Sequence, residues 1–222
     1  MTQDTGLPRP PAAVIFDLDG TLTDPKPGIA GCVRSALLQL GVAAPDIDDL
    51  DWVIGPPLRQ SFLALTGSES MADEGVRLYR ERCGVTGLFE NEVIPGIPAL
   101  LAGLRAGGVT LFVATSKPRD YARRILDHFG LAAAFRAVHG SEFDGTNADK
   151  RDLLRHVVRV EGLEAGTSVM IGDREHDVIG ADVVGIRTIG VRWGYGSDRE
   201  LLDAGAAALV DDPREIAGLL LR

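Results

Sequence analysis

The chain has 222 residues, of which 45% are hydrophobic and 25% are charged, so it holds enough apolar material for a buried core. Its 32 acidic residues outnumber its 23 basic residues and give a formal net charge of -9. A negative overall field repels polyanions, which argues against a nucleic-acid polymer or an anionic membrane as a partner. A small anionic ligand in a local pocket remains compatible with this charge.

The cysteines and the N-terminus indicate the compartment. Cys32 and Cys83 lie far apart in the sequence and lack the spacing of a zinc site or a disulfide framework. Residues 1–11 form a Pro-rich stretch without the basic start and apolar run of a signal peptide, and we expect a loose lead-in there. No apolar run approaches the roughly 18 residues that span a membrane. The expected location is therefore the cytoplasm.

The elements expected in chain order begin with an apolar strand in residues 12–16 and a helix in residues 28–41. Residues 46–92 hold amphipathic helical segments and no clear strand. Helices and short apolar strands then alternate, with strands expected at residues 109–115, 135–140, 167–172, 186–191 and 207–210.

This alternation predicts a parallel sheet covered on both faces. The expected fold class is α/β, with a doubly wound, Rossmann-like core made of residues 12–22 and 94–222. Residues 23–93 form a helical insertion between the first strand and the next repeat.

Carboxylates follow two of the predicted strands. Asp17 and Asp19 stand two apart after the first strand, so both can face one site, and Gly20 lets the backbone approach a ligand closely. Asp173 and Asp177 follow a later strand. Converging carboxylates repel one another unless a cation lies among them, and hard oxygen ligands favour Mg²⁺.

Groups that can bind a phosphate follow other strands. Thr115 and Ser116 come directly after a strand and just before a helix that Pro118 can open, which predicts an anion site. Lys150, at the start of another predicted helix, adds a cation that can bridge a nucleophile and phosphoryl oxygens. Lys117 is a second lysine near Thr115, but we prefer Lys150 for this role.

Four motifs in this order resemble those of the haloacid dehalogenase superfamily of phosphotransferases. They are "DLDGTLTD" from Asp17, the threonine of "VATSKP", Lys150 and "GDREHD" from Gly172. The resemblance covers almost the whole chain from Ala12 and implies that the insertion is a helical cap, which selects the substrate. Further phrases, among them "VIGPPL", "GSEFDGT" and "WGYG", are most similar to the branch of phosphoglycolate phosphatases and 5'-nucleotidases.

The resemblance implies a role for each motif residue. Asp17 would attack phosphorus and form an aspartyl phosphate, and Asp19 would act as general acid and base. Asp17, the backbone carbonyl of Asp19 and Asp173 would hold Mg²⁺, with Asp177 orienting a metal-bound water or Lys150. Thr115, Ser116 and Lys150 would hold the phosphoryl group.

The implied function is Mg²⁺-dependent hydrolysis of a small phosphate monoester, either phosphoglycolate or a nucleoside 5'-monophosphate. Arg59, in the insertion, is the candidate contact for the rest of the substrate, although an exposed helical arginine explains it equally well. Two alternatives stay open. One is a sugar-phosphate mutase of the same superfamily, and the other is a non-catalytic receiver domain that is phosphorylated on aspartate.

Overall fold

The computed structural model describes residues 5–221. The chain divides into two compact units. The first, here called the core unit, contains the segments up to Thr23 and from Val93 onward, and the second, the helical unit, contains Asp24–Glu92. Residues 1–4 of the predicted lead-in lie outside the described residues, and residues 5–11 contain neither helix nor strand.

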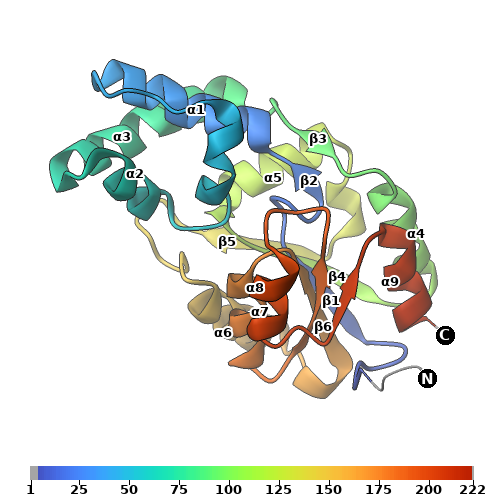
Figure 1. The fold of residues 1–222 in the computed structure, drawn as a ribbon. Coiled ribbons are helices and arrows are strands. Elements are labelled where there is room, and N and C mark those ends of the chain that lie inside the picture. Colours follow the sequence, from blue (N-terminus) through green and yellow to red (C-terminus); the bar gives the residue numbers. More distant parts are fainter. Residues whose placement is uncertain (1–4, 222) are drawn as a thin grey trace. The chain divides into compact units, whose positions relative to one another are not determined.

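The core unit is built on a sheet whose six described strands all run parallel, in the order β5-β4-β1-β6-β7-β8 (Figure 1). The strands are β1 (Ala13–Phe16), β4 (Thr110–Pro118), β5 (Ala137–Ser141), β6 (Ser168–Gly172), β7 (Arg187–Val191) and β8 (Ala208–Val210). The strands β1 and β6 in the middle of the sheet are mostly apolar and buried along their whole length, as expected of strands covered on both faces. The predicted α/β fold class is confirmed.

Six α-helices connect or follow the described strands: α4 (Ile97–Ala106), α5 (Arg119–His128), α6 (Lys150–Glu161), α7 (Glu175–Asp182), α8 (Asp198–Asp203) and α9 (Pro213–Leu220). Parallel crossovers are right-handed, so α4 and α5, which lead from β1 outward to β5, cover one face. The crossover from β5 back to β6 moves the other way, which places α6 and α7 on the opposite face.

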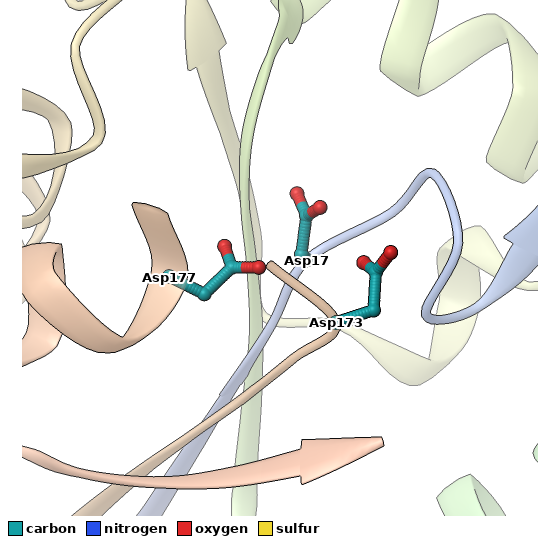
Figure 2. A group of neighbouring side chains, drawn as sticks. All are labelled: Asp17, Asp173 and Asp177. Atoms are coloured by element: carbon teal, nitrogen blue, oxygen red, sulfur yellow. The ribbon is translucent and has the colours of Figure 1, made fainter. Parts of the chain in front are cut away.

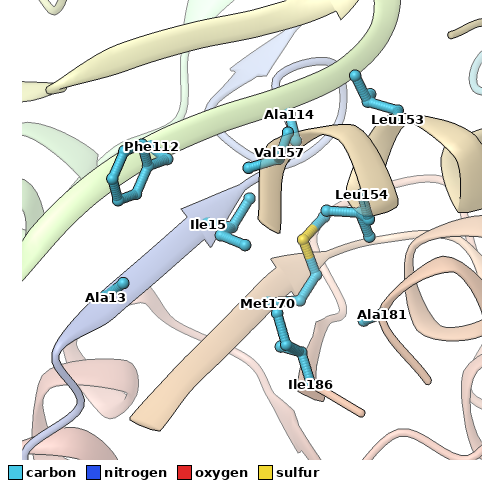
Figure 3. Packing of buried hydrophobic residues seen from close by; sticks show 10 residues of the cluster. All are labelled: Ala13, Ile15, Phe112, Ala114, Leu153, Leu154, Val157, Met170, Ala181 and Ile186. Carbon is cyan, nitrogen blue, oxygen red and sulfur yellow. The ribbon is translucent and has the colours of Figure 1, made fainter. Parts of the chain in front are cut away.

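One side of this sheet shows how the sequence builds the core (Figure 3). Side chains two apart along a strand face the same way, so Ala13 and Ile15 of β1 lie in one buried cluster with Met170 of β6. Leu154 of α6 and Ala181 of α7 complete the cluster from above the sheet. This packing holds α6 and α7 against β1 and β6.

The strand order places β1 next to the point where the winding reverses. From β1 the chain proceeds to β4 and β5 on one side, and then to β6, β7 and β8 on the other. In open α/β sheets, ligands bind beyond the carboxyl ends of the strands at such a switch point. Asp17 directly follows β1 and therefore lies at this point.

The helical unit contains α1 (Lys26–Gln39), α2 (Leu58–Thr66) and α3 (Glu69–Arg82), with a 3₁₀ helix at Ile47–Val53 and a π-helical turn at Cys83–Gly87. Helix α3 begins at Ser68, whose hydroxyl accepts a hydrogen bond from the Met71 amide, as an N-cap residue does. Phe62 of α2 and Tyr79 of α3 pack edge to face with their ring centroids 6.4 Å apart. The predicted insertion is thus helical.

The chain passes between the two units at β2 (Thr23–Asp24) and β3 (Glu92–Val93), which pair as a two-stranded sheet. The sequence did not indicate these strands, because two residues are too few to show an alternating pattern. Within residues 5–221, no helix is both long enough and apolar enough to cross a membrane.

Candidate active site

Asp17 is fixed by the strand that precedes it. Its backbone N–H donates to the carbonyl oxygen of Ile171 at 2.9 Å, which continues the ladder between β1 and β6 one step beyond β1. The Asp17 side chain is 10% exposed, so the carboxylate is nearly buried but open to a small ligand. An apolar strand thus delivers a carboxylate to the switch point.

Three carboxylates converge at this place (Figure 2). Asp17 follows β1, Asp173 follows β6, and Asp177 lies in the first turn of α7. One oxygen from each lies within 4.8 Å of the others, and all three residues are buried. This arrangement can bind a cation with oxygen ligands only.

Lys150 joins two of these carboxylates from the start of α6. Its Nζ lies 2.9 Å from Oδ1 of Asp17 and 2.7 Å from Oδ1 of Asp177. It also donates to the carbonyl oxygen of Ala114 at 2.9 Å, so three oxygen atoms surround the ammonium group. The Lys150 side chain is only 5% exposed, which makes this a fixed, desolvated ammonium group.

Burial and mutual repulsion govern ionisation in the cluster. Burial, together with the charges of Asp177 and Asp17, raises the pKa of the Asp173 carboxyl well above its ordinary value. Burial also raises the pKa of Asp177, although Lys150 opposes the shift. Burial disfavours the ammonium form of Lys150, but the charges of Asp17 and Asp177 outweigh it and raise the pKa of Lys150.

Three carboxyl groups face one ammonium group, so Lys150 alone cannot balance the cluster when all three are ionised. A hard divalent cation bound by Asp17 and Asp173 would supply the missing positive charge, and their oxygens are the ligands that Mg²⁺ prefers. The residues present fit the predicted metal. Asp177 belongs to the same group of carboxylates and also contacts Lys150.

Two loops hold the Asp173 carboxylate in place. The Thr21 hydroxyl donates to its Oδ1 at 3.0 Å, and the backbone N–H of Tyr195 donates to its Oδ2 at 2.9 Å. The indole N–H of Trp193 donates to the carbonyl oxygen of Thr21 at 3.1 Å, which ties the two loops together. Such outer hydrogen bonds orient a metal ligand and adjust its affinity.

Glycines line the space around Asp173 because nothing larger fits. A Cβ at Gly194 would lie 2.2 Å from Cβ of Asp173, and a Cβ at Gly196 would lie 2.0 Å from its carbonyl oxygen. Gly20 has a φ of +84°, and a Cβ there would lie 2.3 Å from Oδ2 of Asp173. The "WGYG" stretch thus forms a wall of this site.

Asp19 has a partner of its own. The Nζ of Lys117 lies 2.8 Å from Oδ1 and 2.7 Å from Oδ2 of Asp19, and the two side chains are 7% and 11% exposed. Burial raises the pKa of Asp19, while the nearby Lys117 ammonium lowers it. The two lysines of the core unit are therefore divided between the two aspartates, with Lys150 at Asp17 and Lys117 at Asp19.

Thr115 and Ser116 lie at the end of β4, the strand next to β1. Thr115 is buried, and its hydroxyl accepts a hydrogen bond from the Lys117 amide at 3.2 Å. The Ser116 carbonyl oxygen accepts from the Ser141 hydroxyl at 2.8 Å. The end of β4 is thereby fixed, with the Thr115 side chain one strand away from Asp17.

Arg59 lies in the helical unit, on α2. Its guanidinium donates to Oδ1 of Asp73 at 2.6 Å and also to Glu69, both on α3. The Arg59 side chain is about half exposed. Its observed contacts are thus ion pairs between α2 and α3, and the substrate contact stays a prediction.

The structure adds contacts that the sequence did not indicate. Thr21 and the Tyr195 amide hold Asp173, and Lys117 clamps Asp19. Thr21 stands inside the first motif, so its position in "DLDGTLTD" was a usable signal. The contact with Tyr195 joins residues 22 positions apart in separate loops, and no local pattern indicates it.

Comparison with known proteins agrees with this geometry. Residues 14–191 match the family described as "Haloacid dehalogenase-like hydrolase". A protein of Pseudomonas aeruginosa named 5'-nucleotidase is 51% identical over 85% of this chain and 86% of its own length. Proteins named phosphoglycolate phosphatase are more distant, for example one of Pseudomonas fluorescens at 28% identity over 93% of this chain and 78% of its own.

A solved structure and one further relative are also similar to this chain. The solved structure of a predicted phosphatase from Clostridium acetobutylicum superposes with a TM-score of 0.91 at 40% identity, covering 95% of this chain and 98% of that one. A Mycobacterium tuberculosis protein named tyrosine-protein kinase PtkA is 41% identical over 94% of this chain and 73% of its own. The predicted family and the predicted phosphatase-type enzyme are confirmed: the chain belongs to the haloacid dehalogenase-like hydrolases.

Proposed function

We propose that this protein hydrolyses a nucleoside 5'-monophosphate in a Mg²⁺-dependent reaction that proceeds through an aspartyl phosphate on Asp17. The observation that carries the proposal is the position of the Asp17 carboxylate. It lies at the switch point of the sheet, with Lys150 on one oxygen and the Asp173 carboxylate beside it. A nucleophilic carboxylate, a fixed cation and a metal ligand are the parts that phosphoryl transfer needs.

The contacts of the residues support a proposed role for each. The Lys150 ammonium orients Asp17 and balances charge on the phosphoryl oxygens, as Thr115 at the end of β4 does by hydrogen bonding. Asp19, two residues after the nucleophile, gives a proton to the leaving alcohol and later takes one from the attacking water. Asp17, Asp173 and the Asp19 carbonyl would hold Mg²⁺, which would neutralise negative charge on the nucleophile and the substrate.

The substrate class is supported by the relatives. The relative named 5'-nucleotidase is 51% identical, whereas the relatives named phosphoglycolate phosphatase are 28% identical. We also propose that the helical unit acts as the cap that selects the substrate, with Arg59 as its candidate contact. Cys32 and Cys83 are buried and form no disulfide within residues 5–221, which supports the expected cytoplasmic location.

The relative named tyrosine-protein kinase PtkA raises a second candidate, transfer of the phosphoryl group to a protein tyrosine. One experiment separates the possibilities. The purified protein is assayed with a panel of nucleoside 5'-monophosphates, phosphoglycolate, and ATP with a tyrosine peptide, each with Mg²⁺ and with EDTA. We expect release of inorganic phosphate with the highest kcat/KM for a nucleotide, and loss of turnover in EDTA.

Other results would replace the proposal. Phosphotyrosine formed without phosphate release favours the kinase candidate, and a preference for phosphoglycolate corrects the substrate. Transfer that yields an isomeric sugar phosphate instead of free phosphate favours the mutase alternative. Phosphorylation without any turnover contradicts an enzymatic role.

A further inference from the structure

The second lysine of the core unit has a partner that the sequence did not suggest. The chain contains three lysines, Lys26, Lys117 and Lys150. By sequence, Lys117 competes with Lys150 for one role. In the structure they contact different aspartates, because Lys150 contacts Asp17 and Lys117 contacts Asp19.

We propose that Lys117 is a positioning residue that holds the Asp19 carboxylate in the orientation required for proton transfer to and from the substrate. This inference rests on the proposed function, in which Asp19 is the general acid and base. In this inference, Lys117 acts neither on the nucleophile nor on the transferred phosphoryl group. Its effect on the reaction passes through Asp19.

The first argument is the geometry of the pair. The Nζ of Lys117 lies 2.8 Å from one oxygen and 2.7 Å from the other oxygen of Asp19. An ammonium group between both oxygens restrains rotation of the carboxylate as well as its distance. A proton-transfer group works only when it is within hydrogen-bond reach of the reacting oxygen, so restrained rotation matters.

The second argument is burial. The side chains of Lys117 and Asp19 are 7% and 11% exposed, so water competes weakly with the contact. A surface pair of the same residue types contributes little, whereas a desolvated pair holds its geometry and leaves an uncompensated charge when one partner is removed. The pair is therefore a fixed part of the site.

The third argument is how the backbone aims Lys117. The register of β4 against β5 shifts between Thr115, opposite Gly140, and Pro118, opposite Ser141. Ser116 and Lys117 are thus extra residues in β4, and an irregularity of this kind redirects side chains at strand ends near active sites. It turns Lys117 toward the end of β1.

The irregular segment is held by specific contacts. The Lys117 amide donates to the Thr115 hydroxyl at 3.2 Å. A Cβ at Gly140 would lie 2.6 Å from the Lys117 carbonyl oxygen, so only glycine lets β5 approach this closely. The backbone under Lys117 is fixed before any substrate binds, as a positioning role requires.

The test compares substrates that differ only in how much protonation their leaving group needs. An alkyl phosphate needs a proton on the departing oxygen, whereas 4-nitrophenyl phosphate releases a stable phenolate. We measure kcat/KM for a series between these extremes with the wild type and with Lys117→Met, Lys117→Arg and Asp19→Asn. Lys26→Met is the matched control, because Lys26 lies in the helical unit and pairs there with Asp48 and Asp51.

The expected result is a change in how steeply kcat/KM depends on the leaving group across the substrate series. For Lys117→Met, kcat/KM for the alkyl phosphate should fall at least about tenfold further than for 4-nitrophenyl phosphate, in the same sense as for Asp19→Asn, since general acid catalysis contributes about 10² or more. Lys117→Arg should recover part of the loss, and Lys26→Met should leave the slope unchanged.

Other outcomes overturn the inference. An equal loss on every substrate in Lys117→Met and Lys117→Arg, with melting temperatures near that of the wild type, shows that Lys117 does not act through Asp19. A loss confined to the KM of substrates with a second anionic group makes it a substrate contact instead. If Asp19→Asn itself shows no change of slope, the acid–base role of Asp19 in the proposed function fails, which is a separate result.

Discussion

The Nζ of Lys150 lies 2.9 Å from Oδ1 of Asp17, and both side chains are at least nine-tenths buried. The two residues are 133 positions apart and meet because α6 begins beside the end of β1. The contact engages Oδ1 of Asp17, and in the proposed function the second oxygen is the one that attacks phosphorus. Most of the following predictions concern this site.

Replacing Lys150 by methionine should lower kcat by at least about 100-fold, because the fixed cation that stabilises developing charge is lost. Two buried carboxylates would also lose their partner. Steady-state kinetics at saturating Mg²⁺, with circular dichroism to check folding, measures the effect. Arg155→Met, on the exposed side of the same helix, is the control and should remain active. A folded Lys150→Met protein with kcat within about threefold of the wild type would contradict the assigned role.

Adding Mg²⁺ should raise the melting temperature of the wild type, because a ligand that binds only the folded state stabilises it, by about 2.7 kcal/mol at 100 times its dissociation constant. In Asp173→Asn the shift should largely disappear. Differential scanning calorimetry with Mg²⁺ and with EDTA makes the comparison. Asp144→Asn changes an exposed loop carboxylate and should keep the full shift. An undiminished shift in Asp173→Asn would show that the cation binds elsewhere.

Gly194→Ala should weaken Mg²⁺ binding and activity although it adds only one methyl group. The new Cβ would lie 2.2 Å from Cβ of Asp173, so the carboxylate must move. Gly218→Ala is a matched control, since Gly218 lies in α9 with no atom near the new Cβ, and alanine there should stabilise the helix by about 0.5–1 kcal/mol. For both variants, Mg²⁺ is titrated while the enzymatic activity is recorded, which gives the Mg²⁺ affinity and the maximal activity. Equal Mg²⁺ affinity in the two variants would contradict the claim that Gly194 is needed to keep the Asp173 carboxylate in place.

His139 should contribute a pH dependence to stability that is independent of the site. Burial lowers the pKa of His139, although its Nε2 lies 2.9 Å from Oε1 of Glu161. The unfolded chain therefore takes up this proton at a higher pH than the folded chain does. Stability should be complete above about pH 6.5, the ordinary pKa of histidine, and should fall as the pH decreases through the folded pKa.

The comparison is between wild type and His139→Gln, with urea unfolding measured from neutral pH to mildly acidic pH. The variant should show a weaker fall of the unfolding free energy with decreasing pH. If both proteins lose stability in parallel, His139 is not the group responsible.

The sequence predicted the parts of this protein that local patterns encode. The apolar runs of β1 and β6 specify strands. Because these strands are parallel neighbours, the aspartates that follow them meet at one edge of the sheet. Asp17, Asp173 and Lys150 could be assigned in this way. Each stands directly after a strand or at the start of a helix, where a small error in element bounds does not change its position.

The contacts that depend on loop conformation could not be predicted. The pairing of Lys117 with Asp19 requires the irregular register of β4 after Thr115, which no periodicity reports. The enclosure of Asp173 by Gly194 similarly requires two loops to meet. Asp177 was expected to orient a metal-bound water or Lys150, and it contacts Lys150 from the first turn of α7.

The central claim is that Asp17 forms a covalent bond to phosphorus. The direct measurement is to quench the enzyme with acid during turnover, reduce with borohydride, and identify modified residues by peptide mass spectrometry. An aspartyl phosphate is reduced to homoserine, so we predict homoserine at position 17, dependent on Mg²⁺ and on substrate. Sustained turnover with an unmodified Asp17, or homoserine at another aspartate, would contradict the account.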